Sequence, residues 1–180
     1  MFVCFSFSFV VKSQDDQPKM NTKGNTNKEM STGYSGTPLA KKLGMKGGMA
    51  VLTVNAPGGY LDLVEPVPEG VTIDEEGNSQ AGSLRSDGGR SDGVDIVHLF
   101  TNSRDELFGE LARLRNVIRQ DGAIWVSWYK KAAKLPTEIT EDTVREAAFP
   151  LGLVDVKVCA VDDKWSGLKV VIRKELRMEK

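Results

Sequence analysis

The stretch from Val94 to Trp128 constrains the fold more than any other part of the chain, because it has the pattern of a strand, a helix and a second strand. Residues 94–100 form a nearly continuous apolar run between Gly93 and a Thr-Asn-Ser cluster, which is typical of a strand buried on both faces. Residues 123–128 form a second such run. Two buried strands joined by a packed helix make a right-handed crossover, so this block predicts an α/β fold with parallel strands.

The segment between the two runs predicts an amphipathic helix that starts after Ser103 and ends at the Asp121-Gly122 pair. Ser103 has the character of an N-cap, and Glu106 three residues later would complete a capping box. Apolar side chains then recur on one face of the helix, at Leu107, Leu111, Leu114 and Ile118. We therefore expect this helix to cover one face of the sheet.

Shorter elements flank this block on both sides. They are a helix from Thr37 to Gly44, a strand at 49–54, a short helix from Tyr60 that Pro66 ends, a strand at 71–73, a helix after Thr140 that ends at Phe149-Pro150, and alternating strands at 154–161 and 168–173 with a DDKWSG turn between them. Together they predict a three-layer α/β sandwich with a mostly parallel sheet that ends in an antiparallel hairpin.

Length and composition place these elements in one domain. A chain of 180 residues with 40% hydrophobic residues is long enough for one buried core, and we expect a single α/β domain at 33–177. Asp74 to Gly93 is polar, glycine-rich and aperiodic, which predicts a flexible insertion at 74–93. Residues 1–32 lack an apolar period beyond their first residues, so we expect a disordered N-terminal extension.

The apolar start of that extension, Phe2 to Val11, has two interpretations. One is a signal peptide, but the segment lacks the basic residues before it and the small-residue cleavage site after it that a signal peptide requires. The segment is also too short to span a bilayer. The other interpretation, which we prefer, is an upstream start codon, with Met20 or Met30 as the native beginning.

Charge and cysteine content exclude several classes of function. The net charge of −1 comes from 24 basic and 25 acidic residues, so no overall field attracts nucleic acid or a membrane, and we expect neither as a partner. The two cysteines, Cys4 and Cys159, are far apart and belong to no Cys/His cluster, which argues against a metal site and suits a reducing cytoplasm.

Several motifs resemble known families. VDIVHLF, ELARLRNVIRQDGAIWVSW and REAAFPLGLVDVKV are similar to strand and helix motifs of the class I S-adenosylmethionine-dependent methyltransferases. GYSGTPLAKKLGMKGG, VNAPGGY, AIWVSWYKKA and VDVKVCAVDDKWSGLKVVIRKELR more closely resemble the bacterial family called domain of unknown function 3052, or DUF3052. The resemblance covers most of the chain and implies a Rossmann-like, reduced methyltransferase-like fold, while the DUF3052 family carries no established activity.

The methyltransferase resemblance also implies a cofactor loop, from which this sequence departs. Those enzymes place a GxGxG-like loop after the first strand and an acidic residue at the end of the second. Here the loop reads Asn-Ala-Pro-Gly-Gly-Tyr at 55–60, with another glycine spacing and a proline that removes an amide donor. Asp74 or Glu75 would stand for the acidic residue. We therefore expect no cofactor.

The ends of three predicted strands define a candidate ligand site. Ligands of open α/β sheets bind beyond the carboxyl ends of the strands, where helix starts present free amides. The candidate residues there are Asn55, Gly58, Gly59, Tyr60, Thr101, Ser103, Trp128, Lys130 and Lys131. Their amides, hydroxyls and lysines suit a small anion such as phosphate or carboxylate. The alternative is purely structural: a helix cap, a glycine turn and a solvated loop.

Three other residues have plausible chemistry but simpler explanations. His98, the sole histidine, lies inside a buried strand and is expected to be a hydrogen-bonded core residue, not a general base. Cys159 is expected to be a packed thiol because no base accompanies it. Trp165 lies in the predicted hairpin turn, where exposure would indicate a partner surface.

Two functional hypotheses follow. The first is a non-enzymatic Rossmann-like module that binds a partner protein or a small anionic ligand at the carboxyl ends of its strands. The alternative is a degenerate S-adenosylmethionine-dependent methyltransferase-like enzyme. No catalytic residue is assigned under either hypothesis.

Overall fold

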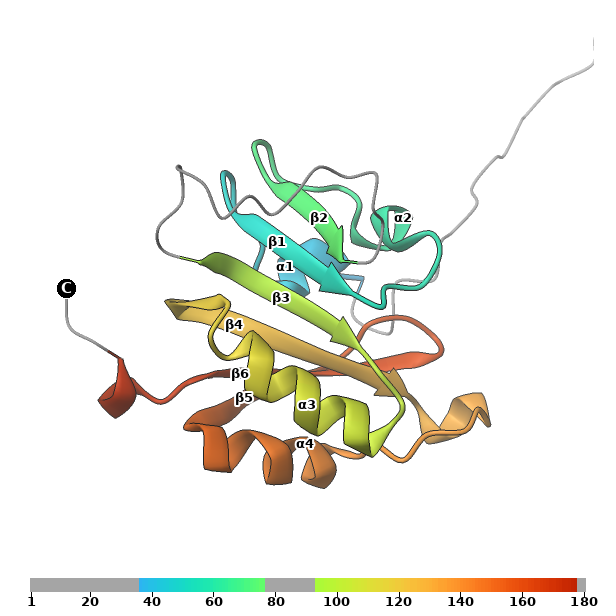
Figure 1. Cartoon of the computed structure of the whole chain (residues 1–180). Coiled ribbons are helices and arrows are strands. Elements are labelled where there is room, and N and C mark those ends of the chain that lie inside the picture. Colours follow the sequence, from blue (N-terminus) through green and yellow to red (C-terminus); the bar gives the residue numbers. More distant parts are fainter. Residues whose placement is uncertain (1–35, 77–92, 178–180) are drawn as a thin grey trace, which may run out of the picture. The chain divides into compact units, whose positions relative to one another are not determined.

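The computed structural model describes residues 36–76 and 93–177, which form one six-stranded sheet with helices on both faces (Figure 1). The predicted N-terminal extension at 1–32 and most of the predicted insertion at 74–93 lie outside the described residues. All arrangements below concern the compact unit that begins at Ser31.

The elements follow the order expected of an α/β chain. The strands are β1 (Ala50–Val54), β2 (Thr72–Glu76), β3 (Val94–Phe100), β4 (Ile118–Tyr129), β5 (Leu153–Ala160) and β6 (Trp165–Ile172). The helices are α1 (Leu39–Leu43), α2 (Tyr60–Val64), α3 (Arg104–Leu114) and α4 (Glu141–Ala148), with short 3-10 turns η1 (Lys131–Ala133), η2 (Phe149–Leu151) and η3 (Lys174–Leu176).

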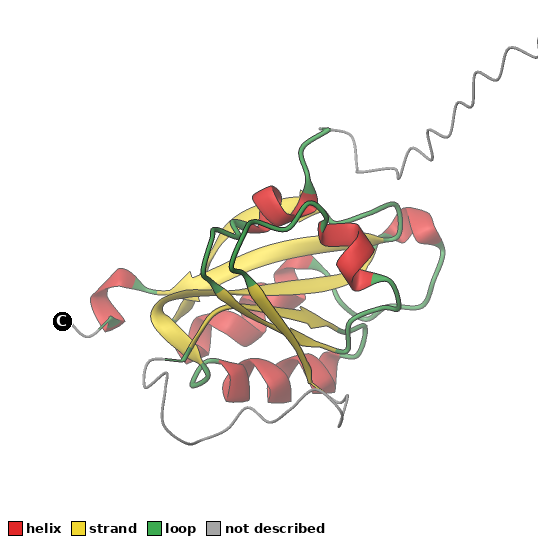
Figure 2. Cartoon of the chain, turned by 90° about the horizontal axis from the view of Figure 1, so that it is seen from above, coloured by secondary structure: helices red, strands yellow, loops and turns green. Residues whose placement is uncertain are grey.

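The sheet has the strand order β2-β1-β3-β4-β6-β5. β2, β1, β3 and β4 run parallel to one another, and β6 pairs antiparallel with both β4 and β5. Figure 2 shows the strands of the sheet in yellow, with helices in red on both sides of them. The predicted fold class, a mostly parallel α/β sheet that ends in an antiparallel hairpin, is therefore confirmed.

Side chains alternate between two cores, one on each face of the sheet. The first core joins the sheet to α3 and α4 through residues such as Leu52, Leu99 and Val126. The second joins it to α1 and α2 through the neighbouring positions, Val51 and Phe100 among them. Because both faces are covered, the central strands are apolar throughout, which explains the continuous hydrophobic runs in the sequence (Figure 1).

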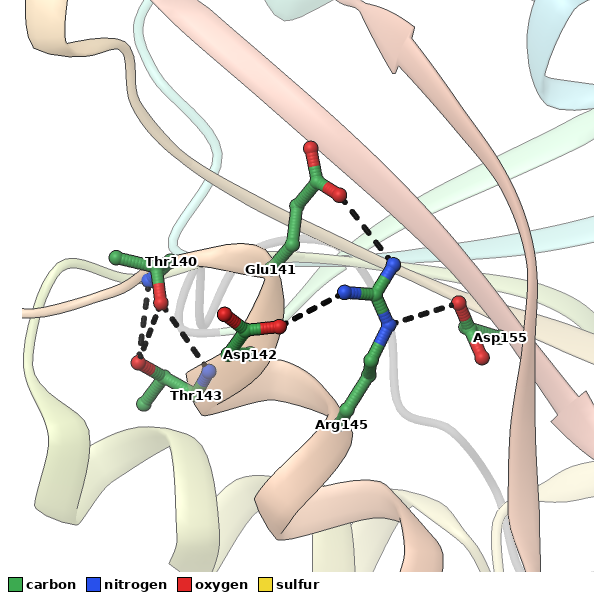
Figure 3. Close-up of polar contacts among 6 residues, drawn as sticks. All are labelled: Thr140, Glu141, Asp142, Thr143, Arg145 and Asp155. Carbon is green, nitrogen blue, oxygen red and sulfur yellow. Dashed lines mark hydrogen bonds and ion pairs between the residues drawn. The ribbon is translucent and has the colours of Figure 1, made fainter.

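Helix α4 starts at the predicted cap and is tied to the sheet by a charged contact. The Thr140 side chain accepts a hydrogen bond from the Thr143 amide, and the Thr143 side chain accepts one from the Thr140 amide (Figure 3). Arg145 pairs with Glu141 and Asp142 on its own helix, and its Nε donates to Asp155 of β5 at 3.0 Å. Local capping and one longer contact thus set the position of α4.

The predicted end of the long helix is wrong. Helix α3 ends at Leu114, and Ile118, predicted to lie on its apolar face, is instead the first residue of β4 and pairs with Val94. The register then shifts, so that Ile96 pairs with Ala123 and the intervening residues bulge out. Gly122 therefore lies in the bulge and does not close a helix: a Cβ there would stand 3.0 Å from the carbonyl oxygen of Asp95.

Three smaller boundaries also differ from the predictions. Pro38, not Thr37, occupies the N-cap position of α1. Strand β2 continues to Glu76 because it pairs with β1 as far as Val54, so the start of the predicted insertion is regular sheet. Trp165 is the first residue of β6, is 8% exposed and packs on the ring of Tyr129, so it offers no exposed partner surface.

Candidate functional site

The carboxyl ends of the adjacent strands β1 and β3 place Asn55 and Thr101 around one carboxylate. Nδ2 of Asn55 donates a hydrogen bond to Oε1 of Glu106 at 2.7 Å. Oγ1 of Thr101 donates to Oε2 of the same side chain at 2.5 Å. Two of the predicted site residues thus come together, but both donors are already engaged by Glu106, which sequence reasoning had assigned to a capping box.

The start of α3 is also occupied by a carboxylate of the chain itself. The Arg104 amide donates to Oε2 of Glu138 at 2.9 Å, and the Ser103 amide donates to Oγ1 of Thr101 at 3.2 Å. Ser103 occupies the N-cap position, but its side chain makes no capping hydrogen bond, so the predicted capping box is wrong. Glu138 takes the place that an external anion would need at this helix start.

The loop after β1 brings its two glycines to the surface and buries its tyrosine. Gly59 has a φ of 82°, which glycine adopts without steric cost, and stands at the N-cap of α2. Gly58 is exposed beside it. Asn55 has a φ of 54°, an uncommon value that asparagine tolerates better than most residues. Tyr60 points into the second core and is 6% exposed, so its ring is not part of an open site.

The end of β4 contributes less than its sequence suggested. Trp128 is buried in the first core, on the side of α3 and α4. Nζ of Lys130 donates to the carbonyl oxygen of Asp162 at 2.5 Å and so ties the loop to the hairpin. Lys131 is exposed at the start of η1. Trp128 and Lys130 therefore have structural contacts of their own.

Asn102 connects the ends of β3 and β4 and is not among the predicted site residues. Its Oδ1 accepts a hydrogen bond from the Tyr129 amide at 2.8 Å, and its carbonyl oxygen accepts one from the Glu138 amide at 2.9 Å. Asn102 thereby holds the segment that carries Glu138 against the start of α3. Its place directly after a predicted strand was the available signal.

A buried row of hydrogen-bonded side chains, Tyr60, His98 and Ser127, lies beneath this edge. The Tyr60 hydroxyl is 3.0 Å from Nδ1 of His98, and Nε2 of His98 is 2.8 Å from Oγ of Ser127. The imidazole also packs on Phe100, with ring centroids 4.3 Å apart. The expectation of a hydrogen-bonded core histidine is confirmed.

Burial determines the protonation of His98 and Tyr60 in this row. It lowers the pKa of His98 to about 3 and raises the pKa of the Tyr60 hydroxyl, because each charged form would lose its hydration. His98 is 0% exposed and both of its ring nitrogens have partners. At neutral pH it is therefore an uncharged structural group.

Cys159 is half-buried against the second core, which confirms the expectation of a packed thiol. Burial raises its pKa, although the charges of Lys157, Lys42 and Lys130 act in the opposite direction. No group of three or more His, Cys, Asp or Glu side chains within residues 36–76 and 93–177 could hold a metal ion. No helix formed by the described residues is long and apolar enough to cross a bilayer.

Comparisons with known proteins agree with this architecture. Residues 72–174 match the family model "Protein of unknown function (DUF3052)". No curated protein matches the sequence. Among solved structures, a SAM-dependent methyltransferase from Aquifex aeolicus is similar with a TM-score of 0.55 and 20% identity, over 75% of this chain and 88% of that one.

Two further structures are similar more loosely. They are a ribosomal protein L11 methylase from Lactobacillus delbrueckii subsp. bulgaricus (TM-score 0.49, 12% identity, 75% of each chain) and a TehB-like SAM-dependent methyltransferase from Corynebacterium glutamicum (TM-score 0.44, 13% identity, 75% of this chain and 85% of that one). The fold comparison rests on the Aquifex structure. At 20% identity, this similarity shows a methyltransferase-like, Rossmann-like fold and does not bear on activity.

Proposed function

The chain belongs to the DUF3052 family of proteins of unknown function, and from that premise we propose that it is a non-enzymatic binding module for a partner protein. The partner would present a basic side chain to the carboxyl ends of β1 and β3. Of the two ligand classes expected at this edge, a partner protein suits the contacts better than a small anion, because Glu106 and Glu138 already take the donors that an anion would use.

The orientation of the Glu106 carboxylate carries this proposal. Asn55 and Thr101 each donate one hydrogen bond to it, and the residue is exposed at the strand ends. A carboxylate offers about four lone-pair positions, so two remain for an incoming donor. A carboxylate held in this way loses little side-chain entropy on binding, and an ammonium or guanidinium group would form a charge-assisted hydrogen bond with it.

The protonation of the buried side chains His98 and Tyr60 supports a non-enzymatic role. His98 is the one histidine of the chain, and burial keeps it neutral and away from the strand ends. Tyr60 is similarly buried, with a raised pKa. This histidine and this tyrosine therefore serve the core beneath the edge.

The alternative, a degenerate methyltransferase-like enzyme, has one specific observation in its favour. Strand β2 ends in an acidic residue, Glu76, which pairs with Val54 at the end of β1. This is the region in which the related fold places an acidic residue for its cofactor, although Asp74 or Glu75 had been expected in that role. The Glu76 carboxylate, however, accepts a hydrogen bond from Arg113 at 2.7 Å, which occupies it within the protein.

A titration of the full-length protein followed by amide NMR distinguishes these functions. N-acetylarginine amide stands for a basic partner, and phosphate and S-adenosylmethionine stand for the competing ligands. We expect N-acetylarginine amide to shift the amide signals of Asn55, Thr101 and Glu106, and a Glu106→Gln variant to lose this response. Asp121→Asn removes an equal charge from the remote start of β4 and should retain it.

Two results would overturn the proposal. One is a response of the same amides to phosphate and not to the arginine derivative, which would restore the small-anion hypothesis. The other is saturable binding of S-adenosylmethionine, which would favour the enzyme.

A further inference from the structure

Two lysines face each other across the β5–β6 hairpin on the side of the sheet that α1 covers. Lys157 pairs directly with Lys169 in the antiparallel register. Like charges in directly opposed positions repel and destabilise a hairpin. Such a pair is unexpected, because the chain has 25 acidic residues for its 24 basic ones and a carboxylate could stand opposite either lysine.

Lys169 lies in a confined environment. It is half-buried, it pairs with Trp125 on its other side, and its Nζ stands 3.9 Å from the place that a Cβ on Gly44 would occupy. Within residues 36–76 and 93–177 its Nζ makes no hydrogen bond or ion pair. Burial lowers its pKa, and the charges of Lys157 and Lys46 lower it further.

The charges that act on Lys169 within the described part of the chain are those of other lysines. Among the described residues, no carboxylate forms an ion pair with Lys46, Lys157 or Lys169. The thiol of Cys159, two residues from Lys157, also lies near positive charge, because Lys157, Lys42 and Lys130 all act to lower its pKa against the larger effect of burial. Nearby positive charges thus act to lower the pKa values of both Lys169 and Cys159.

A purely structural role explains one of these lysines. Nζ of Lys157 donates to the carbonyl oxygen of Lys42 at 3.4 Å, near the end of α1, where cations are favourable. That contact leaves the half-buried Lys169 unexplained.

We propose that Lys157 and Lys169 form a binding site for the phosphate group of a small molecule, between α1 and the β5–β6 hairpin. Each ammonium group offers three donors, and lysine binds phosphate as a compact point charge. A bound phosphate would relieve the repulsion across the hairpin. The site is separate from the strand-end edge, shares no residue with it and does not depend on the proposed partner binding.

Calorimetric titration of the full-length protein with pyrophosphate, at constant ionic strength in chloride, tests the site. We expect saturable binding that weakens about tenfold in Lys169→Met, since a hydrogen bond to a charged group contributes about this much. Lys164→Met removes an exposed lysine at the far end of the same hairpin and should bind as the wild type does. Absence of binding, equal affinity in Lys169→Met, or binding of a polyglutamate peptide in place of pyrophosphate would overturn the proposal.

The melting temperature without anion separates a ligand-binding lysine from a structural one. Lys169→Met should melt at or above the temperature of the wild type, because it removes a half-buried charge and a like-charge pair. A lower melting temperature together with unchanged pyrophosphate affinity would make Lys169 a structural residue and refute the site. If Lys169→Met does not fold, Lys169→Gln, which also removes the charge, provides the same comparison.

Cys159 can report occupancy directly. A Cys4→Ser variant leaves it as the sole thiol, because the chain has two cysteines. Pyrophosphate should slow its alkylation at pH 8 several-fold, since neutralised lysines no longer favour the thiolate. An alkylation rate that pyrophosphate leaves unchanged, under conditions that saturate the calorimetric binding, would place the anion elsewhere and overturn the assignment.

Discussion

Acidification to pH 5 should destabilise this protein through His98, and the effect can be calculated from its environment. Burial lowers the pKa of the folded imidazole to about 3, whereas an unfolded histidine has a pKa near 6.5. Between pH 6.5 and pH 3 the histidine is protonated in the unfolded chain but not in the folded protein. The free energy of unfolding therefore decreases as the pH falls through this range. Each pH unit below 6.5 costs about 1.4 kcal/mol, which gives about 2 kcal/mol between pH 7 and pH 5.

NMR gives the most direct measurement, because His98 is the only histidine and its ring signals need no assignment against others. We expect those signals to keep the chemical shifts of a neutral imidazole from pH 7 to pH 5 for as long as the protein stays folded. A titration with a midpoint near 6.5 in the folded protein would refute the reasoning, because it would show that burial and the contacts with Tyr60 and Ser127 do not suppress protonation.

Denaturant unfolding at pH 7, 6 and 5 measures the corresponding free energy. His98→Gln should lose about 2 kcal/mol of the pH dependence that the wild type shows. Ser127→Ala is the matched control, since it removes one partner of the imidazole and keeps the titrating group. Carboxylates titrate alike in all three proteins, so their effect cancels. Equal pH dependence in the wild type and His98→Gln would contradict the calculation.

Three further substitutions test the fold by denaturant unfolding. Gly109→Ala should stabilise the protein by about 0.5–1 kcal/mol, because this helical position has open space and alanine has the better helix propensity; a loss of stability would contradict this. Gly93→Ala should instead destabilise it by more than about 1 kcal/mol, since φ is 77° and the new Cβ would meet the Val117 carbonyl oxygen at 2.5 Å; an unchanged midpoint would be incompatible with that geometry. Thr140→Ala should cost about 1 kcal/mol through loss of the α4 cap, and an unchanged unfolding midpoint would contradict a stabilising cap.

Periodicity in the sequence predicted the elements whose ends depend on local signals. β3 matches its predicted range, and α2 begins at Tyr60 as expected. Helix α4 begins after the Thr140 cap because that signal acts within one turn. The hairpin follows from the alternation of apolar residues in its two strands. Such contacts connect residues that are close in the chain, so the pattern around each residue contains the necessary information.

The boundary between α3 and β4 could not be predicted in this way. The residues from Arg115 to Ile118 continue the helical pattern, but Ile118 gains a strand partner in Val94 and the chain leaves the helix to pair with it. The competing interaction comes from the next strand in the sheet. Local propensity is a weak preference that tertiary contacts routinely override.

The candidate site shows the same division between local and distant contacts. The position of Asn55 and Thr101 at neighbouring strand ends followed from the order of the strands. Their engagement by Glu106 did not, because Asn55 and Glu106 are 51 residues apart. Glu138 likewise reaches the start of α3 from 34 residues away. Short-range patterns in the chain therefore specified most of its strands, the cap of α4 and the apolar faces. The carboxylates at the strand ends arise instead from the packing of strands and helices, which brings charged groups together across sequence separations that no local pattern encodes.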